Sequence, residues 1–434
     1  MSRGASTALR AWLREHARPF AIDRGPSASR LQPLNSLLAD ARVTLLGESA
    51  PDARETVLLR LALLRYLAAR GATLLGMPCT PARALRLQQG LMDAVPADSG
   101  RAARPAQDWL HAHDAAERLF IERLVGGRGS RAPHLRDQIA VFGTGLRSTW
   151  LPAPGSAQDN ADRLAALAEA HDLLDLQLAG TNAAGNPARR IDDLRRLLAP
   201  PAGESLVAAA ERLDWALDWM DMQFAPLTDA LGSSGYAALR NLMQWSREWA
   251  AGTASDEITE GQLAHVLAER WPAARAVVYG HCADLVRDDA HARKTPLPAA
   301  TFPATTFPAT TRPAPAAAVR SAGDFIARTL LPGTATARRT ASIWCLHGGG
   351  LRNRNASGRP RAQVRQKLPP GSLNARLAVL GEAFVLPLHA LDDPRAAPLR
   401  EPQLVVTADG TAIEIRLQAQ VDLICFLPEA NDCA

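Results

Sequence analysis

The stretch RVTLLGESAPDARETVLLRLALLRYLAARGATLLGM, residues 42–77, decides the fold. An apolar run ends at Gly47, a long leucine-rich segment follows, and a second apolar run occupies residues 72–77. The leucines of the middle segment recur at helical spacings, which predicts a helix between two strands, with Gly71 as its C-cap. The predicted core positions of this helix are Val57, Leu58, Leu61, Leu64 and Leu67. Short strands that are apolar throughout are typical of a parallel sheet covered by helices on both faces.

Similar signals recur along the chain. Three short apolar runs predict further strands at 139–142, 276–279 and 342–346. Near the end, a hairpin is predicted at 403–407 and 412–416 around Asp409-Gly410, followed by a strand at 421–427. Asp-Gly between two alternating runs favours a tight antiparallel turn, so we expect the hairpin to make the sheet mixed. The predicted fold class is α/β, with a mixed, largely parallel central sheet flanked by helices.

Composition and periodicity divide the chain into four parts. These are an N-terminal helical segment at 1–30, a first part of the α/β core at 31–156, a helical insertion or cap at 157–270, and a second part of the core at 271–434. Four tryptophans of the insertion fall at helical spacing, which favours helix packing, although they could line a pocket: Trp215, Trp219, Trp245 and Trp249. The pentapeptide TFPAT is repeated within residues 295–319, and proline at every fifth position predicts a flexible loop there.

The charge and the cysteine content limit the classes of function that the sequence allows. The net charge of +5 comes with only two lysines among 49 basic residues, which is weak support for phosphate contacts. Five cysteines lack any CxxC spacing, so neither a disulfide framework nor a zinc site is expected. No signal peptide or membrane span is recognisable, and a cytoplasmic protein is expected. Residues 328–376 contain basic but no acidic side chains, which could hold an acidic partner or could simply be a solvated loop.

Two polar residues directly follow predicted strands. Ligands of parallel α/β sheets bind beyond the carboxyl ends of the strands, which makes Glu48 and His281 candidates for acid–base chemistry. Their alternatives are an acid that stabilises the following helix and a satisfied buried histidine. Arg60 could pair with Glu48, clamp a substrate oxygen, or pair at the surface with Glu55. The Gly-rich stretch 347–350 is interpreted as a turn, and no motif for a metal, a cofactor or a serine nucleophile is present.

The order of several segments resembles the erythromycin esterase family. The similar blocks are LQPLNSLLADARVTLLGES with RETVLLRLALLRYLAARGATLLGM, DWLHAHDAAE at 108–117, IAVFGTGLRS at 139–148, ARAVVYGHCADLVRD at 274–288, GSLNARLAVLGEAFVLPL at 371–388 and QVDLICFLPEANDCA at 420–434. The resemblance covers roughly residues 31–434, with the proline repeat as an insertion. It implies an α/β fold and metal-independent ester hydrolysis, in which a histidine activates water.

Carried over residue by residue, the resemblance implies an altered centre. Glu48, Arg60 and the first histidine of the later motif, His281, are retained. The water-activating histidine is replaced by Pro51, and Asp284 stands in place of the second histidine of the later motif. Other family positions are occupied by Pro78 (or Cys79), Gly145 and Phe325. Proline has no protonatable group, so conventional macrolide hydrolysis is disfavoured.

Three hypotheses remain open. The first is a non-catalytic binding or partner protein, possibly in a biosynthetic pathway, which holds a small molecule or peptide at the strand ends with Arg60, Glu55 and His113 as ligand-binding residues. The second is a repurposed enzyme that uses Glu48, His281 and Asp284 for hydrolysis, elimination or cyclisation of a natural product or peptide. A conventional esterase that recruits another histidine, such as His113 or His347, is the least favoured.

Overall fold

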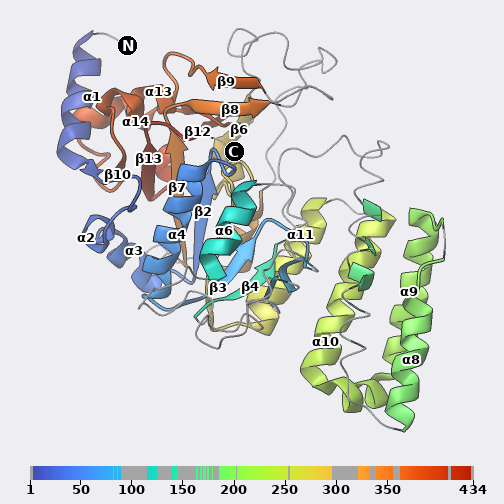
Figure 1. Ribbon diagram of the computed structural model, residues 1–434. Coiled ribbons are helices and arrows are strands. Elements are labelled where there is room, and N and C mark those ends of the chain that lie inside the picture. Colours follow the sequence, from blue (N-terminus) through green and yellow to red (C-terminus); the bar gives the residue numbers. More distant parts are fainter. Residues whose placement is uncertain are drawn as a thin grey trace, which may run out of the picture. The chain divides into compact units, whose positions relative to one another are not determined.

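A computed structural model of the protein describes residues 3–81, 83–85, 87–88, 115–125, 138–144, 163–164, 167–168, 170–172, 174, 178, 185–201, 203–252, 255–295, 321–332, 339–354, 362–408 and 412–431 (Figure 1). The predicted loop at 295–319, apart from Thr295, lies outside the described residues, as do His113 and Gly145. The chain forms two compact units. One comprises Met1–Gly76, Gly90–Ala140 and Leu267–Ala434, and the other comprises Met77–Gln89 and Val141–Val266.

An eight-stranded sheet organises the α/β architecture. Its strands, in spatial order, are β1 (Arg18–Pro19), β10 (Phe384–Pro387), β13 (Leu423–Leu427), β7 (Thr340–His347), β2 (Val43–Glu48), β5 (Arg275–His281), β3 (Ala72–Met77) and β4 (Ala140–Gly143). The five strands from β13 to β3 pair in parallel, whereas β10 and β1 are antiparallel to their neighbours. The prediction of a mixed, largely parallel sheet flanked by helices is confirmed.

The opening stretch forms the predicted strand–helix–strand unit. Helix α4 (Arg54–Ala68) connects β2 to β3, and β5 lies between these two strands in the sheet. Both strands are mainly apolar, apart from a threonine in each and Glu48 at the end of β2, and they are largely buried, as a doubly covered sheet requires. The core face of α4 is wider than predicted, since Leu59 and Leu63 are also buried, while Leu58 is only half-buried. Gly71 adopts a left-handed φ of 89° where the chain turns into β3, two residues beyond the C-cap Ala69.

The source of the antiparallel pairing differs from the expectation. The predicted hairpin forms as β11 (Gln403–Val406) and β12 (Ala412–Ile415), but it pairs with β6 (Ala292–Thr295) in a separate three-stranded sheet. The central sheet is mixed because of β10 and β1 instead. The N-terminal segment is likewise not wholly helical: α1 (Arg3–His16) ends before β1, since Pro19 cannot continue a helix and fits an edge strand.

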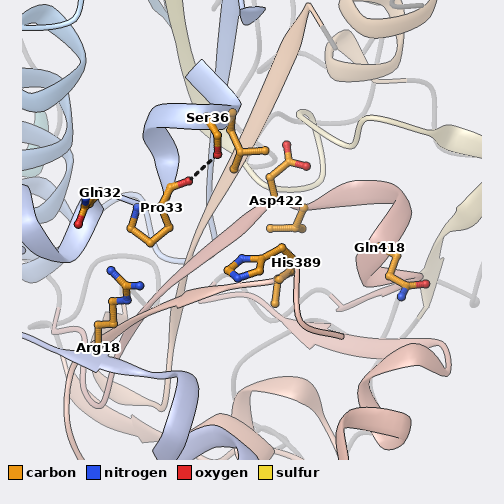
Figure 2. A pocket seen from close by; sticks show the side chains of 10 residues that line it. Arg18, Gln32, Pro33, Ser36, His389, Gln418 and Asp422 are labelled. Atoms are coloured by element: carbon orange, nitrogen blue, oxygen red, sulfur yellow. Dashed lines mark hydrogen bonds between the residues drawn. The ribbon is translucent and has the colours of Figure 1, made fainter. Parts of the chain in front are cut away.

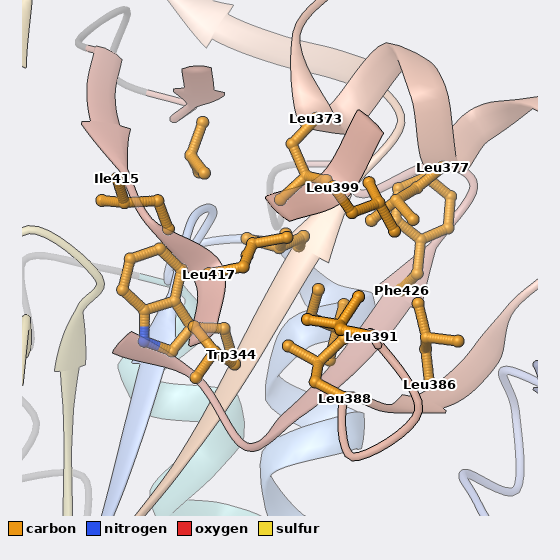
Figure 3. Close-up of a cluster of buried hydrophobic side chains, with 14 of the residues drawn as sticks. Trp344, Leu373, Leu377, Leu386, Leu388, Leu391, Leu399, Ile415, Leu417 and Phe426 are labelled. Atoms are coloured by element: carbon orange, nitrogen blue, oxygen red, sulfur yellow. The ribbon is translucent and has the colours of Figure 1, made fainter. Parts of the chain in front are cut away.

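Short helices and a small hairpin complete the first unit. They are α2 (Ala28–Leu31), α3 (Leu34–Asp40), α6 (Ala115–Val125), α12 (Ala322–Asp324), α13 (Leu373–Leu377), α14 (Ala397–Arg400) and α15 (Leu417–Gln420), with β8 (Gly350–Arg354) and β9 (Ala362–Gln366) as the hairpin. Helix α6 lies beside α4 (Figure 1). On the sheet, Trp344 of β7 and Phe426 of β13 pack with leucines of α13 and α14 in a buried cluster (Figure 3).

The second unit is mainly helical in its described part. It contains α8 (Asn186–Leu198), α9 (Leu206–Met222), α10 (Phe224–Ala251) and α11 (Ser255–Ala264), and α10 is interrupted at Gly232, whose φ is 72°. Trp245 and Trp249 stack with ring centroids 5.5 Å apart and are buried, as expected for packing residues. Trp215 departs from that expectation because it is 58% exposed. No helix in the described ranges is long and apolar enough to cross a membrane.

Candidate functional site

The carboxyl ends of the central strands bring a row of polar side chains together. Glu48 of β2 is in register with His281 of β5 on one side and with Cys345 of β7 on the other. Cys345 is in turn in register with Cys425 of β13. Residues in register on neighbouring parallel strands project from the same face of the sheet. The predicted proximity of Glu48 and His281 is therefore present, within a row that continues into two buried thiols.

Arg60 of α4 forms a bidentate ion pair with the carboxylate of Glu48. The Arg60 Nε donates to Glu48 Oε1 at 2.7 Å, and Nη2 donates to Oε2 at 2.5 Å. Glu48 is fully buried and Arg60 is 3% exposed. This bidentate pairing agrees with one of the roles predicted for Arg60, and it differs from the alternative of a surface pair with Glu55.

Further contacts fix the guanidinium of Arg60. Its central carbon lies 4.2 Å from the ring centroid of Tyr279 and 5.0 Å from that of Phe120. Its Nη2 also donates to the backbone oxygen of Pro51 at 3.1 Å. Arg60 thus connects the end of β2, the turn that follows it and the aromatic rings beside it.

The ion pair and its burial act against one another on the pKa of Glu48. Complete burial raises the pKa of this carboxyl, while the charge and hydrogen bonds of Arg60 lower it, and burial prevails. For Arg60, burial is the largest single effect and lowers the pKa, but the charge and hydrogen bond of Glu48, together with Tyr279 and Asp52, raise the pKa overall. Because both carboxylate oxygens accept guanidinium N–H groups, the geometry fits an ionised pair in which Arg60 fixes the orientation of the Glu48 carboxylate.

Two histidines, at the ends of the strands on either side of β2, share one local geometry. The backbone N–H of Ala283 donates to His281 Nδ1 at 3.2 Å, and that of Gly349 donates to His347 Nδ1 at 3.1 Å. Since Nδ1 accepts in both cases, each neutral ring carries its proton on Nε2. Both rings are nearly buried, at 6% and 1% exposed. The sequence signal of His347 was weak: a histidine followed by glycines at the end of a predicted strand.

Two other predicted site residues are Asp284, which follows β5, and Glu55, which is in the first turn of α4. Asp284 is half-buried in the turn after β5, where its backbone N–H donates to the His281 oxygen at 3.0 Å. Glu55 accepts from the backbone N–H of Asn431 at 2.7 Å and from its Nδ2 at 3.2 Å, so it holds the C-terminal segment. The ligand-binding roles of Glu55 and of His113, which lies outside the described residues, stay predictions.

Close packing accounts for the Gly-rich stretch after β7. Gly349 and Gly350 have positive φ values of 130° and 143°. A Cβ at Gly350 would overlap the backbone oxygen of Ala430, and one at Gly348 would lie 2.5 Å from that of Pro428. The glycines therefore let this bend approach the C-terminal segment.

Comparisons with known proteins add a relation of fold. No family model matches the sequence, and no curated protein matches it. Among solved structures, a mutant of the erythromycin esterase EreC in its open conformation is similar over 94% of this chain and 95% of its own, with 16% identity and a TM-score of 0.54. The chain shares its fold with an erythromycin esterase. A structural-genomics protein from Bacillus cereus (14% identity, TM-score 0.61) and a succinoglycan biosynthesis protein (13%, 0.58) are each similar over 99% of both chains. At these identities the likeness shows the fold alone.

Several arginines of the basic stretch 328–376 form contacts within the chain. Arg328 pairs with Asp288 at 2.6 Å and with Asp324 at 3.2 Å, and Arg365 pairs with Glu429. Part of the positive charge that was considered for an acidic partner is thus matched internally. Within the described residues, no group of three or more His, Cys, Asp or Glu side chains is arranged to hold a metal.

Proposed function

We propose that this protein is a non-catalytic binding or partner protein built on an erythromycin esterase-like scaffold. The observation that carries the proposal is the fully buried Glu48, whose two carboxylate oxygens are both held by Arg60. A general base needs an oxygen within hydrogen-bond reach of the proton that it removes. The ion pair supports a positioning role for Glu48, and Pro51 supplies no base in its place.

The proposed ligand is a small molecule or peptide bound beyond the carboxyl ends of β2, β5 and β7. Sites of parallel sheets lie at this edge. His281 and His347 support recognition there because a backbone N–H donates to Nδ1 of each buried ring and fixes the ring's orientation. Fixed side chains favour binding, since less side-chain freedom is lost when a ligand is held.

A repurposed enzyme is the second candidate. It is favoured by the register that places Glu48 and His281 side by side, with Asp284 three residues further along the chain. In this reading the ion pair would have to open, or His281 and Asp284 would divide the acid and base roles between them. The reaction would be hydrolysis, elimination or cyclisation of a natural product or peptide.

Histidine variants separate the two candidates. We would compare the wild-type protein with His281→Ala and His347→Ala in assays with 4-nitrophenyl acetate, a macrolide lactone and a metabolite extract analysed by mass spectrometry. The binding proposal predicts that a compound is retained unchanged and that its retention falls in both variants, without turnover in any sample. His291→Ala is the matched control, because this exposed ring pairs with Asp288 outside the site.

Glu48→Gln is less informative as a first variant, since it breaks a buried ion pair. Its activity is interpretable only beside a measured unfolding transition. Turnover by the wild type that disappears in His281→Ala, and survives in His291→Ala, would refute the binding proposal in favour of the enzyme. An acidic partner at residues 328–376 is a separate part of the proposal, and its affinity should fall steeply with added salt.

A further inference from the structure

A cavity lies at the amino-terminal ends of the parallel strands, whereas Glu48 lies at the carboxyl-terminal end of β2. Its volume is about 740 Å³, within the range of roughly 300–1,000 Å³ that is usual for small-molecule pockets. Asp422, which immediately precedes β13, and His389, which follows β10, are part of its wall, together with Arg18 of β1 (Figure 2). Because β13 begins where antiparallel β10 ends, these residues mark the amino ends of the parallel strands.

The charges of this cavity leave it positive. The carboxylate of Asp422 accepts from Arg287 at 2.6 Å and from the backbone N–H of Ser342 at 2.8 Å, and it is almost completely buried. The negative charge of Asp422 is therefore neutralised by Arg287. Within the described part of the chain, no acidic side chain pairs with Arg18. The Arg18 guanidinium and the His389 imidazole face the same space beside Pro33 (Figure 2).

The remaining wall combines neutral polar groups with apolar surface. Gln32 and Ser36 contribute an amide and a hydroxyl, and the Ser36 hydroxyl lies 3.4 Å from the Pro33 oxygen, at the long end of a hydrogen bond. Leu388 and Val421 contribute apolar surface. Sites for small organic molecules usually combine apolar surface with a few polar groups that point into the cavity.

We propose that this cavity binds a small organic anion whose phosphate or carboxylate group is held by Arg18 and His389. A planar guanidinium with several N–H donors matches either anion in a bidentate arrangement. The apolar wall would cover the rest of the ligand. This site is independent of the proposed function at the strand carboxyl ends, because the two sets of residues do not overlap.

Histidine-selective NMR tests the proposal on the full chain. The protein has ten histidines, and the resonance of His389 is assigned with His389→Gln. Inorganic phosphate and acetate are titrated separately at pH 7, with sodium chloride adjusted to keep the ionic strength constant. We expect a saturable shift of the His389 resonance. Saturation by phosphate alone assigns a phosphate-bearing ligand, and saturation by acetate alone assigns a carboxylate.

Arginine variants show whether the cavity or the overall charge is responsible. Arg18→Gln should weaken binding by about tenfold or more, as expected for the loss of a charged hydrogen-bond donor. Arg24→Gln removes the same charge from an almost fully exposed side chain outside the cavity wall, and should leave binding unchanged. The proposal is overturned if neither anion shifts the His389 resonance, or if both variants weaken the response equally. Unchanged far-UV circular dichroism verifies that each variant is folded.

Discussion

The Glu48–Arg60 ion pair allows a prediction about stability that depends on pH. In Arg60→Met, a side chain of similar length still fills the space between Tyr279 and Phe120, but the fully buried Glu48 loses its partner. Removing one member of a buried pair costs about 3–5 kcal/mol, because the remaining charge is uncompensated. We expect a loss of this size in the free energy of unfolding at pH 7.

The loss in the free energy of unfolding should be smaller at pH 5 than at pH 7. Burial raises the pKa of Glu48 above its usual value of 4.5, and without Arg60 less opposes that effect. Consider pH values between the pKa of Glu48 in the unfolded chain and its higher pKa in the folded variant. Here the folded variant keeps a proton on Glu48 that the unfolded chain releases, so the free energy of unfolding falls as the pH rises. The slope is at most about 1.4 kcal/mol per pH unit. Arg60→Met should therefore lose up to about 2–3 kcal/mol between pH 5 and pH 7, relative to the wild type.

Urea denaturation at both pH values measures these differences. Arg365→Met is the control, since it breaks an exposed pair with Glu429 and should cost less than about 1 kcal/mol at either pH. A second variant, Glu48→Gln combined with Arg60→Met, removes both charges and should recover part of the loss at pH 7. An equal loss for Arg60→Met at pH 5 and pH 7, or a loss no larger than that of the control, would refute the reasoning.

Three further predictions concern other parts of the molecule. Gly350→Ala should lower the free energy of unfolding by about 3 kcal/mol or more, because a Cβ would overlap the Ala430 oxygen; Gly381→Ala, at an open position with φ 72°, should lose only about 1–2 kcal/mol in the same urea series. Burial and a hydrogen bond to Asp221 raise the pKa of Tyr236 to about 12, so Asp221→Asn should lower that pKa in an ultraviolet titration; an unchanged titration curve would contradict the assignment. Burial raises the pKa of Asp289 to about 6, which predicts stability that falls as the pH rises from about 3.8 to 6; Asp289→Asn should therefore gain on the wild type over this range in thermal melts, and a constant difference would argue against it.

The sequence signals succeeded where structure is local or follows a general rule of topology. The β2–α4–β3 unit is readable because its periodicity changes from a short apolar run to helical spacing and back. The proximity of Glu48 and His281 followed from the rule that the ends of parallel strands meet at one edge. The helical position of Arg60 already allowed its pairing with Glu48, although spacing alone did not exclude a surface role.

Features that depend on long-range pairing were not readable. The edge strand β1 has two residues and contains Pro19, so it carries no alternating pattern. The hairpin of β11 and β12 was correctly predicted, but local turn chemistry does not specify its partner β6. The register between β7 and β2 places Cys345 beside Glu48 and so puts His347 two residues beyond that position, which no single segment encodes.

The contacts of Arg60 separate the positioning of the site from its chemistry. Arg60 bonds to the side chain of Glu48 and to the backbone oxygen of Pro51, so it holds residue 51 whatever the side chain there. The resemblance to the esterase family implies that this position carries the water-activating histidine. Exchange of that histidine for proline would remove the base and still leave the ion pair, the turn and the buried histidines in place. Binding needs only the positions that this ion pair maintains, whereas hydrolysis at this position needs a proton acceptor that proline does not have.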